Sequence, residues 1–345
     1  MSPYPLSPIA YKLVPMIDFL AVGDIVTEPF IKLKDATVHC NIDNENCTIS
    51  MRWGDKIPYE SAVLCRAVGN SPNAATSAAR IGLKTALVSD IGDDDIGKGN
   101  LEQLALEGID ASHITTHKGM VSNYHYVLSY ESERTILVKH EEYPYHWPEI
   151  EAPRFMYISS MASNSLPYHR EIEAYLEQHP DIFVTLQPGT FQMKLGVAQL
   201  KSLYERANLI VINKEESERI LSIPESEHHE MKELLTKVKG LGPRAVIITD
   251  GRNGAYAFDG SAMYSIPMYP DDRAPVERTG AGDAFASTVT AALALGKPFA
   301  EALLWGPINS MSVVQEIGAQ KGLLSRAAIE KYLQSAPPEY KVSSL

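Results

Sequence analysis

The chain has 345 residues, enough for one large domain or two ordinary ones, and its 45% hydrophobic and 21% charged residues are typical of a globular protein. The net charge of −12 argues against a general binder of nucleic acid or anionic membrane, because both need a basic protein surface. A small anionic ligand needs only a local positive field. No run of about 18 apolar residues occurs and the proline-rich start lacks the shape of a signal peptide, so we expect neither a membrane span nor secretion.

Cysteine usage predicts a reducing compartment. The three cysteines, Cys40, Cys47 and Cys65, are odd in number and widely spaced, which does not suggest a disulfide framework. No cluster of His and Cys has the spacing of a zinc site. We therefore expect a cytoplasmic protein without structural disulfides.

Apolar patterns predict strands that alternate with helices along most of the chain. The segments at 16–24, 85–92, 154–160, 181–188, 208–216 and 244–254 resemble buried strands with polar or glycine turns after them. Helical spacing or alanine-rich composition marks the segments at 70–82, 99–110, 168–179, 280–296 and 298–318. This alternation predicts an α/β protein with a mostly parallel central sheet and helices on both faces.

Two β-rich excursions interrupt this rhythm in the first half of the chain. They cover about 27–65 and 115–142, and the second is predicted to be a hairpin that turns at 131–134. The two excursions could pair into a small second sheet. Ligands of parallel sheets bind beyond the carboxyl ends of the strands. The residues expected at that edge are Asp24, Asn213, Thr249 and the turn at 280–283.

The segment "GDDDIGKG" at 92–99 has the glycine and lysine spacing of a phosphate-binding P-loop. Gly99 stands where the loop needs a magnesium-binding hydroxyl. Three consecutive aspartates would each repel a triphosphate, by roughly 4 kcal/mol at 4 Å and an effective dielectric of 20. We interpret the segment as an acidic turn before a helix.

The turn "ERTGAGD" offers a different anion site. Gly280 and Gly282 let the backbone come close to an anion, and the free N–H groups at a helix start attract it. Asp283 in the first helical turn could be a helix cap or a catalyst. We call a turn whose backbone N–H groups bind an anion an anion nest. Such a nest beside an ionised carboxylate favours a catalytic role for Asp283. Together they are the apparatus of phosphoryl transfer to an alcohol.

Several segments in chain order share the pattern of one known family. They are Gly23-Asp24, "GNSPNAATSAARIG", "IGDDDIGKGNLEQLALEGID", "NKEES", "TDGRNG", "ERTGAGDAF" and "SVVQEIGAQKG". Over roughly residues 17–335 the chain resembles the ribokinase-like (PfkB) family of sugar and nucleoside kinases. The resemblance implies a three-layer α/β/α core at 17–26, 66–114 and 143–335. It also implies a small β-sheet lid at 27–65 and 115–142, with tails at 1–16 and 336–345.

The resemblance implies roles for the matched residues. Asp283 would be the general base, and Gly280, Ala281, Gly282 and the Asp283 amide would form the anion hole. The residues implied for nucleotide binding are Asn213, Thr249, Gly251, Gly254 and Asn309, with Glu216 holding Mg²⁺ through water. The residues implied for sugar hydroxyls are Asp24, Gly69, Asn70 and Asn73. In many relatives the lid also mediates dimerisation, so a homodimer is expected.

Some positions leave the substrate and the ions open. Tyr124 and Tyr126 share one face of the lid hairpin, where they could stack on a base or furanose ring, or simply pack against the body. Glu277 and Arg278 replace residues that precede the family's turn, which leaves potassium activation undecided. Gln187 replaces a common aspartate.

The function we expect is ATP-dependent phosphorylation of a primary hydroxyl on a small sugar of the ribose, fructose or keto-deoxy-sugar type. A nucleoside kinase with the same mechanism is the first alternative. A ligand-binding protein without catalysis on the same fold is the second. The retained Asp283 argues against that second alternative, because a silent descendant has no need of a base.

Overall fold

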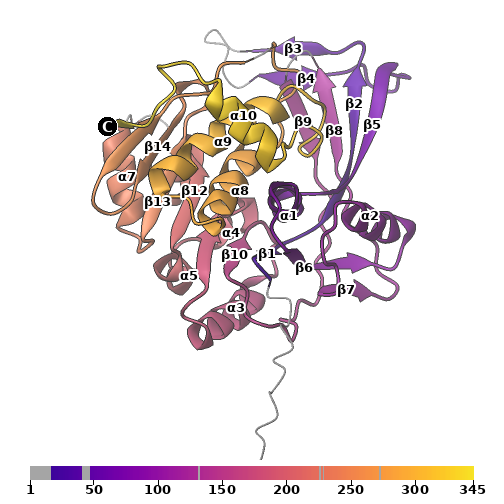
Figure 1. Ribbon diagram of the computed structural model, residues 1–345. Helices are drawn as coiled ribbons and strands as arrows, with labels where there is room; N and C mark the ends of the chain where they lie inside the picture. Colours follow the sequence, from indigo (N-terminus) through magenta and orange to yellow (C-terminus); the bar gives the residue numbers. More distant parts are fainter. Residues whose placement is uncertain (1–16, 41–46, 131–132, 225–226, 228, 272) are drawn as a thin grey trace, which may run out of the picture.

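The computed structural model describes residues 17–40, 47–130, 133–224, 227, 229–271 and 273–345 (Figure 1). The tail predicted at 1–16 lies outside the described residues. The described chain forms a large central sheet, a smaller four-stranded sheet and a short two-stranded ribbon. None of its helices combines the length and the apolar character that a membrane span requires.

The central sheet has ten strands, and seven of them run parallel. In spatial order the strands are β16 (Ser343–Ser344), β15 (Met263–Ile266), β14 (Ala255–Phe258), β13 (Ala245–Thr249), β12 (Leu209–Asn213), β11 (Phe183–Leu186), β10 (Phe155–Ile158), β1 (Phe19–Val22), β6 (Thr85–Gly92) and β7 (Ile114–His117). All pairs from β13 to β7 are parallel, and β14, β15 and β16 add an antiparallel edge. The parallel part ends its strands on a common edge, where a ligand site is expected.

Helices cover both faces of this sheet because its strands are apolar on both sides. In β1, Phe19 and Ala21 belong to one hydrophobic core, while Leu20 and Val22 belong to the other, and all four are fully buried. The first core is completed by α1 (Asn70–Ile81), α2 (Asp95–Leu106), α8 (Ala281–Ala294), α9 (Phe299–Val313) and α10 (Arg326–Gln334). The second is completed by α3 (Leu166–Gln178), α5 (Lys201–Arg206), α6 (Lys214–Ile220) and α7 (Met231–Lys239). The predicted three-layer α/β/α fold is confirmed.

The two β-rich excursions combine into one sheet beside this core (Figure 1). Its order is β5 (Tyr59–Val68), β2 (Val26–Leu33), β8 (Tyr126–Tyr130) and β9 (Glu133–Leu137). The predicted hairpin is the antiparallel pair β8–β9, and the parallel pair β2–β8 joins it to the first excursion. We call this four-stranded sheet the lid.

Two predicted boundaries differ from the structure. Residues 114–117 form β7 and pair with β6 in the central sheet, so the second lid segment begins after them rather than at 115. The segment predicted as a tail at 336–345 is packed on the core. Tyr340 is 6% exposed and β16 pairs with β15. An aromatic anchor and a ladder of hydrogen bonds thus hold the end of the chain in place.

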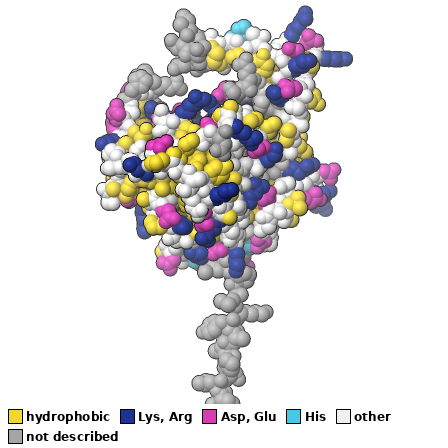
Figure 2. Space-filling model, turned by 45° about the horizontal axis from the view of Figure 1, so that its top comes forward, with side chains coloured by type: hydrophobic (Ala, Val, Ile, Leu, Met, Phe, Trp, Pro, Cys, Tyr) yellow, Lys and Arg dark blue, Asp and Glu magenta, His cyan; other side chains and the backbone are white. Residues whose placement is uncertain are grey.

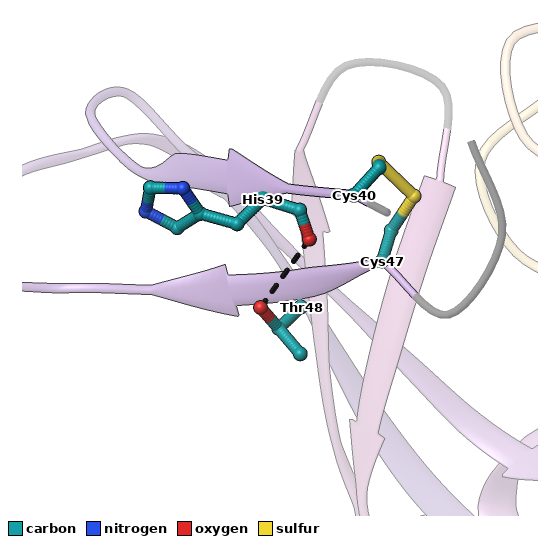
Figure 3. The surroundings of a disulfide bond; sticks show 4 residues. All are labelled: His39, Cys40, Cys47 and Thr48. Carbon is teal, nitrogen blue, oxygen red and sulfur yellow. Dashed lines mark hydrogen bonds between the residues drawn. A yellow bond between two sulfur atoms is a disulfide. The ribbon is translucent and has the colours of Figure 1, made fainter. Parts of the chain in front are cut away.

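The prediction that the cysteines form no disulfide is wrong. Cys40 and Cys47 are bonded to each other at the end of the ribbon formed by β3 (Thr37–His39) and β4 (Thr48–Ser50) (Figure 3). His39 and Thr48 are cross-strand partners, so the residues next to them face each other. Disulfides persist in oxidising environments, so cysteine usage no longer supports a reducing compartment.

Charged side chains of both signs share the surface seen in Figure 2. Lys and Arg side chains lie among Asp and Glu side chains there, rather than in one continuous basic stripe. An extended polyanion would therefore find no broad positive surface on this face.

Candidate active site

The site is built around the start of α8, where the backbone turns sharply. Gly280 is the residue before the helix and has φ 80°, in the left-handed region that favours glycine. A Cβ on Gly280 would stand 2.3 Å from the Cβ of Ala319, so the turn has no room for a side chain. No side chain of the described residues caps this helix, which leaves N–H groups of its first turn free for an anion.

Asp283 lies in that first turn and accepts hydrogen bonds from three side-chain amides. Asn70 Nδ2 donates to Oδ1 at 2.7 Å, and Asn73 Nδ2 donates to Oδ2 at 2.8 Å. Gln187 Nε2 donates to Oδ1 at 3.0 Å. Within the part of the chain that the structure describes, the carboxylate thus binds three donors and no cation, an arrangement that suits its ionised form.

Two further side chains determine which way these amides point. Gln320 Nε2 donates to Asn73 Oδ1 at 3.0 Å and to the carbonyl of Ala67 at 2.7 Å, which leaves the amide nitrogen of Asn73 for Asp283. The hydroxyl of Tyr157, on β10, donates to Gln187 Oε1 and directs the nitrogen of that amide in the same way. Both amides are therefore oriented by their second hydrogen bond.

The pKa of Asp283 is raised, and burial is the main cause. The hydrogen bonds from Asn73, Asn70 and Gln187 act in the opposite direction, while the nearby charge of Glu28 adds to the rise. A carboxylate with a raised pKa is a stronger proton acceptor than an exposed one. This is the property that a general base requires.

Asp24 forms a second buried carboxylate cluster, just after β1. Its Oδ2 accepts from His140 Nε2 at 2.6 Å, and both of its oxygens accept from the Tyr145 hydroxyl, at 3.0 and 2.9 Å. The ring of His140 lies 5.6 Å from that of His125 and 5.7 Å from that of Phe191. Asp24 therefore lies among aromatic rings.

Gly69 precedes α1 and passes close to Asp24. It has φ 116°, and a Cβ on it would lie 2.9 Å from the Asp24 carbonyl oxygen. Since Asn70 and Asn73 begin the same helix, this close approach joins the Asp24 turn to two of the donors on Asp283.

A pocket adjoins the start of α8. The predicted residues Thr249, Gly251 and Gly254 line it, together with Ala281 and Gly282. Sequence reasoning did not assign the remaining lining residues, which are Arg252, Met268, Asp271, Pro275, Arg278, Phe285, Pro307, Ser310, Met311 and Val314. The glycine loop after β13 and the turn at 280–283 thus share one pocket.

Asn213 and Glu216 cap α6 reciprocally. Asn213 Oδ1 accepts from the Glu216 amide at 2.7 Å, and Glu216 Oε2 accepts from the Asn213 amide at 2.9 Å. Burial raises the pKa of Glu216, and the charge of Asp283 raises it further. The cap thus uses one carboxylate oxygen of Glu216. The carboxylate is also close enough to Asp283 for the two charges to interact.

Among the described residues, no group of three or more His, Cys, Asp or Glu side chains is arranged to hold a metal. Mg²⁺ in kinases is commonly bound by one or two carboxylates together with waters and substrate phosphates. Glu216 gives one carboxylate oxygen to the cap of α6, and the other oxygen would be available for a metal bound in that mode.

Two predicted residues are not brought to this site. Asn309 is fully buried, donates to Thr288 Oγ1 at 2.7 Å and accepts from the Leu324 amide at 2.9 Å, so it ties α9 to its neighbours. Tyr126 shares a face of β8 with Tyr124, as predicted, and their rings lie 5.2 Å apart. His125 points to Glu28, so Tyr126 points to the other face of the lid and is 45% exposed.

No sequence signal identified Tyr145, Tyr157 or Gln320 as parts of the site. Each reaches its partner from a distant segment of the chain, a relation that local spacing does not record. Gln187 could have been found, because the position was conspicuous as an amide at the end of a buried strand.

Comparison with known proteins identifies the family of the chain. Residues 35–326 match the model of the pfkB family carbohydrate kinases. The ATP-dependent 6-phosphofructokinase of Thermoanaerobacterium thermosaccharolyticum is 25% identical over 284 residues, 79% of this chain and 85% of that protein. The ribokinase of Bacillus subtilis is 26% identical over 271 residues, 77% of this chain and 87% of that protein.

A solved structure shares the fold across most of the chain. The nucleoside kinase of Methanocaldococcus jannaschii, an archaeal member of the ribokinase family, superposes with a TM-score of 0.73. It is 17% identical and the match covers 93% of this chain and 99% of that one. The protein is a phosphotransferase with an alcohol acceptor, and the chain belongs to the pfkB family of carbohydrate kinases.

Proposed function

We propose that this protein transfers the γ-phosphoryl group of ATP to a primary hydroxyl of a small sugar of the ribose, fructose or keto-deoxy-sugar type. The observation that carries the proposal is the position of Asp283. Its carboxylate is held by three amide donors in the first turn of α8, and the preceding residues Ala281 and Gly282 line the pocket together with Thr249 and Gly251. The start of α8 thus combines a candidate base, an anion nest and the edge of a pocket.

In this proposal Asp283 accepts the proton of the substrate hydroxyl as its oxygen attacks the γ-phosphorus, and ADP leaves in line. The N–H groups of the turn at 280–283 donate to the oxygens of the transferring group, whose charge grows in the transition state. Asp24, Gly69, Asn70 and Asn73 surround the sugar. The lid excludes water, which would otherwise compete as acceptor and hydrolyse ATP.

Glu216 is the residue that would hold Mg²⁺, through water, and Asn213 would support it as part of the shared cap. When bound, the metal supplies positive charge to the phosphates of ATP. Thr249, Gly251 and Gly254 line the nucleotide pocket. The buried carboxylate of Glu277 is already paired with Arg134, so we propose that no monovalent cation is required there, which activity in sodium, potassium and Tris buffers would test.

A nucleoside is the second candidate acceptor, and one observation favours it. The rings of His125, His140 and Phe191 lie near one another beside Asp24, and such rings can stack on a base. A sugar has no base to stack on these rings, so with a sugar acceptor they would serve only in packing.

An ADP-release screen with ATP and Mg²⁺ tests both candidates. The panel is ribose, deoxyribose, fructose, 2-keto-3-deoxygluconate, adenosine, cytidine and inosine. Turnover of nucleosides alone would reject the sugar proposal. Asp283→Asn should lower kcat by about 10²–10⁴-fold with nucleotide binding retained, and unchanged turnover would reject the mechanism. Nucleotide and sugar binding without turnover of any acceptor would support the non-catalytic alternative.

The proposal extends to assembly and location. Large apolar side chains on the lid strands are exposed, namely Tyr59, Val63, Leu64, Tyr126, Ile136 and Leu137. We propose that a second copy of the chain covers them in a homodimer, which sedimentation would detect. We also propose that the protein acts in the cytoplasm, where ATP is available. The Cys40–Cys47 disulfide is the observation that argues against this location, and cell fractionation would test the proposal.

A further inference from the structure

Two adjacent Glu-Arg pairs connect the lid to the segment that leads into the catalytic turn. Glu133 and Arg134 begin β9, and Glu277 and Arg278 stand directly before Thr279 and the turn at 280–283. Arg134 Nε lies 3.5 Å from Glu277 Oε1, and Arg278 Nη1 lies 3.5 Å from Glu133 Oε1. The two ion pairs are reciprocal, so one lid strand meets the segment at two neighbouring points.

The two ion pairs differ in burial. The side chain of Glu277 is 8% exposed and that of Arg134 is 30% exposed. The side chains of Arg278 and Glu133 are 50% and 68% exposed, so water and salt screen that pair. Removing one partner of a buried pair leaves an uncompensated charge, whereas an exposed pair contributes little. The Arg134–Glu277 pair is therefore the one whose loss would leave a buried charge uncompensated.

Glu277 also determines the path of the chain into the turn. Its Oε1 accepts from the Thr279 amide at 2.7 Å and from the Thr279 hydroxyl. Its own amide donates to the Val314 carbonyl at 3.2 Å. Its Oε2 is buried and has no hydrogen-bond partner among the described residues. The charge of Glu277 thus depends on Arg134 for compensation.

We infer that Arg134 is a positioning residue for phosphoryl transfer, acting through Glu277. With the lid strand against the turn, the guanidinium compensates a negative charge three residues before Gly280 and holds Glu277 where it orders Thr279. Without that contact, an uncompensated carboxylate would repel the phosphoryl group that the turn is to receive. The predicted effect of Arg134 on catalysis rests on the proposed function. Its predicted effect on the order of residues 277–283 rests on the contacts alone.

Kinetic measurements on substituted enzymes test the catalytic consequence. Arg134→Met should lower kcat at least about tenfold and change KM for ATP by less than about threefold, because the nucleotide pocket does not include Arg134. Arg134→Lys should restore most of the rate. Adding Glu277→Gln to Arg134→Met should also recover activity, because the buried charge is then gone.

Glu133→Gln is the matched control, since it breaks the exposed pair on the same strand. It should leave kcat within about twofold of the unsubstituted enzyme. The inference is overturned if Arg134→Met behaves like Glu133→Gln. It is also overturned if the loss lies in KM for ATP alone, or if the double substitution is no better than Arg134→Met.

Hydrogen–deuterium exchange without any substrate separates this inference from the proposed function. Arg134→Met should speed amide exchange at 277–283, and Glu133→Gln should not. If the unsubstituted protein phosphorylates no acceptor, the proposed function fails. The exchange experiment still tests whether Arg134 orders residues 277–283. Equal exchange at 277–283 in Arg134→Met and the unsubstituted protein would overturn the inference.

Discussion

Gln187 donates from Nε2 to Oδ1 of Asp283, and the other end of its amide accepts from the buried hydroxyl of Tyr157. Tyr157 lies in the middle of a central strand, so the carboxylate of Asp283 is oriented from inside the core. The amide nitrogen stabilises the ionised form of Asp283. Its partners should therefore influence the pH dependence of catalysis.

Gln187→Ala should move the acidic limb of the kcat/KM profile to higher pH. A hydrogen bond to the ionised carboxylate lowers its pKa, so losing the bond raises the pKa of Asp283 further. Tyr157→Phe should shift the limb in the same direction but less, because Gln187 stays in place. A pH–rate series from pH 5 to 9 measures the shift. A profile that keeps its acidic limb in Gln187→Ala would contradict Asp283 as the titrating base.

Gly280→Ala and Gly282→Ala should fail for different reasons. A methyl group on Gly280 meets Ala319 at a positive φ, so we expect a loss of about 2 kcal/mol in the free energy of unfolding. A methyl group on Gly282 has only Gln187 Nε2 nearby, at 4.0 Å, so Tm should hold while kcat falls at least about tenfold. Gly296→Ala is the control, because Gly296 has φ 80° but open surroundings.

These three variants require Tm and kcat measured on the same preparations. Gly296→Ala should lower Tm slightly through backbone strain and leave kcat alone. A Gly282→Ala enzyme with normal turnover would argue that the turn does not receive the phosphoryl group.

Tyr145→Phe should weaken sugar binding more than ATP binding. The substitution removes the hydroxyl that holds both oxygens of Asp24, and hydrogen bonds to charged groups are worth about 1.5–3 kcal/mol. We expect KM for the acceptor to rise about tenfold or more, with KM for ATP unchanged. Tyr143→Phe is the control, because Tyr143 donates to the Val121 carbonyl instead. Equal effects of the two substitutions would indicate general loss of packing.

Asp90 should make the protein less stable as pH rises from about 4 to 6. Burial raises the pKa of Asp90 to about 6, although its hydrogen bond with His117 opposes the shift. In the unfolded chain the same group titrates near its ordinary value of 3.8. The native state thus binds more protons within this window, and stability falls with rising pH. Urea unfolding at pH 4, 5, 6 and 7 should show a shallower decline for Asp90→Asn, and parallel curves would contradict this.

Thiol titration should find one free cysteine in the unfolded, unreduced protein and three after reduction. The disulfide joins Cys40 to Cys47, and Cys65 is free. In the native protein Cys65 should react slowly, because burial and the charges of Glu28 and Glu277 raise its pKa to about 11. Replacing both bonded cysteines by serine should leave kcat unchanged. Three reactive thiols without reduction would contradict the bond.

The fold could be predicted from the sequence because strand segments that are apolar on both faces alternate with helical segments along the chain. The Asp283 turn could also be predicted, since glycine spacing and a carboxylate are local signals. Gln320 and Tyr157 could not, because they lie 247 and 30 residues away in the sequence from the amides that they orient. Asn309 was assigned to the nucleotide from the family resemblance, but the face of α9 that carries it turns inward, which the sequence alone does not reveal.

Cys40 and Cys47 were missed for a related reason. The count of cysteines was odd, and counting over the whole chain hid a pair that a short ribbon brings together. Tyr126 was placed correctly with Tyr124 on one face, but the alternation of a strand does not say which face looks inward.

The contact between Gly280 and Ala319 has a consequence for synthesis of the protein. A nascent chain that ends near residue 300 already contains Asp283, Asn70 and Gln187, but it lacks Ala319, which packs on the turn, and Gln320, which orients Asn73. Domains begin to fold as they leave the ribosome. An emerging chain could thus form most of its sheet while the anion nest is still incomplete. Kinase activity should therefore begin only after the C-terminal segment that contains Ala319 and Gln320 has been synthesised, so an incomplete chain should not hydrolyse ATP.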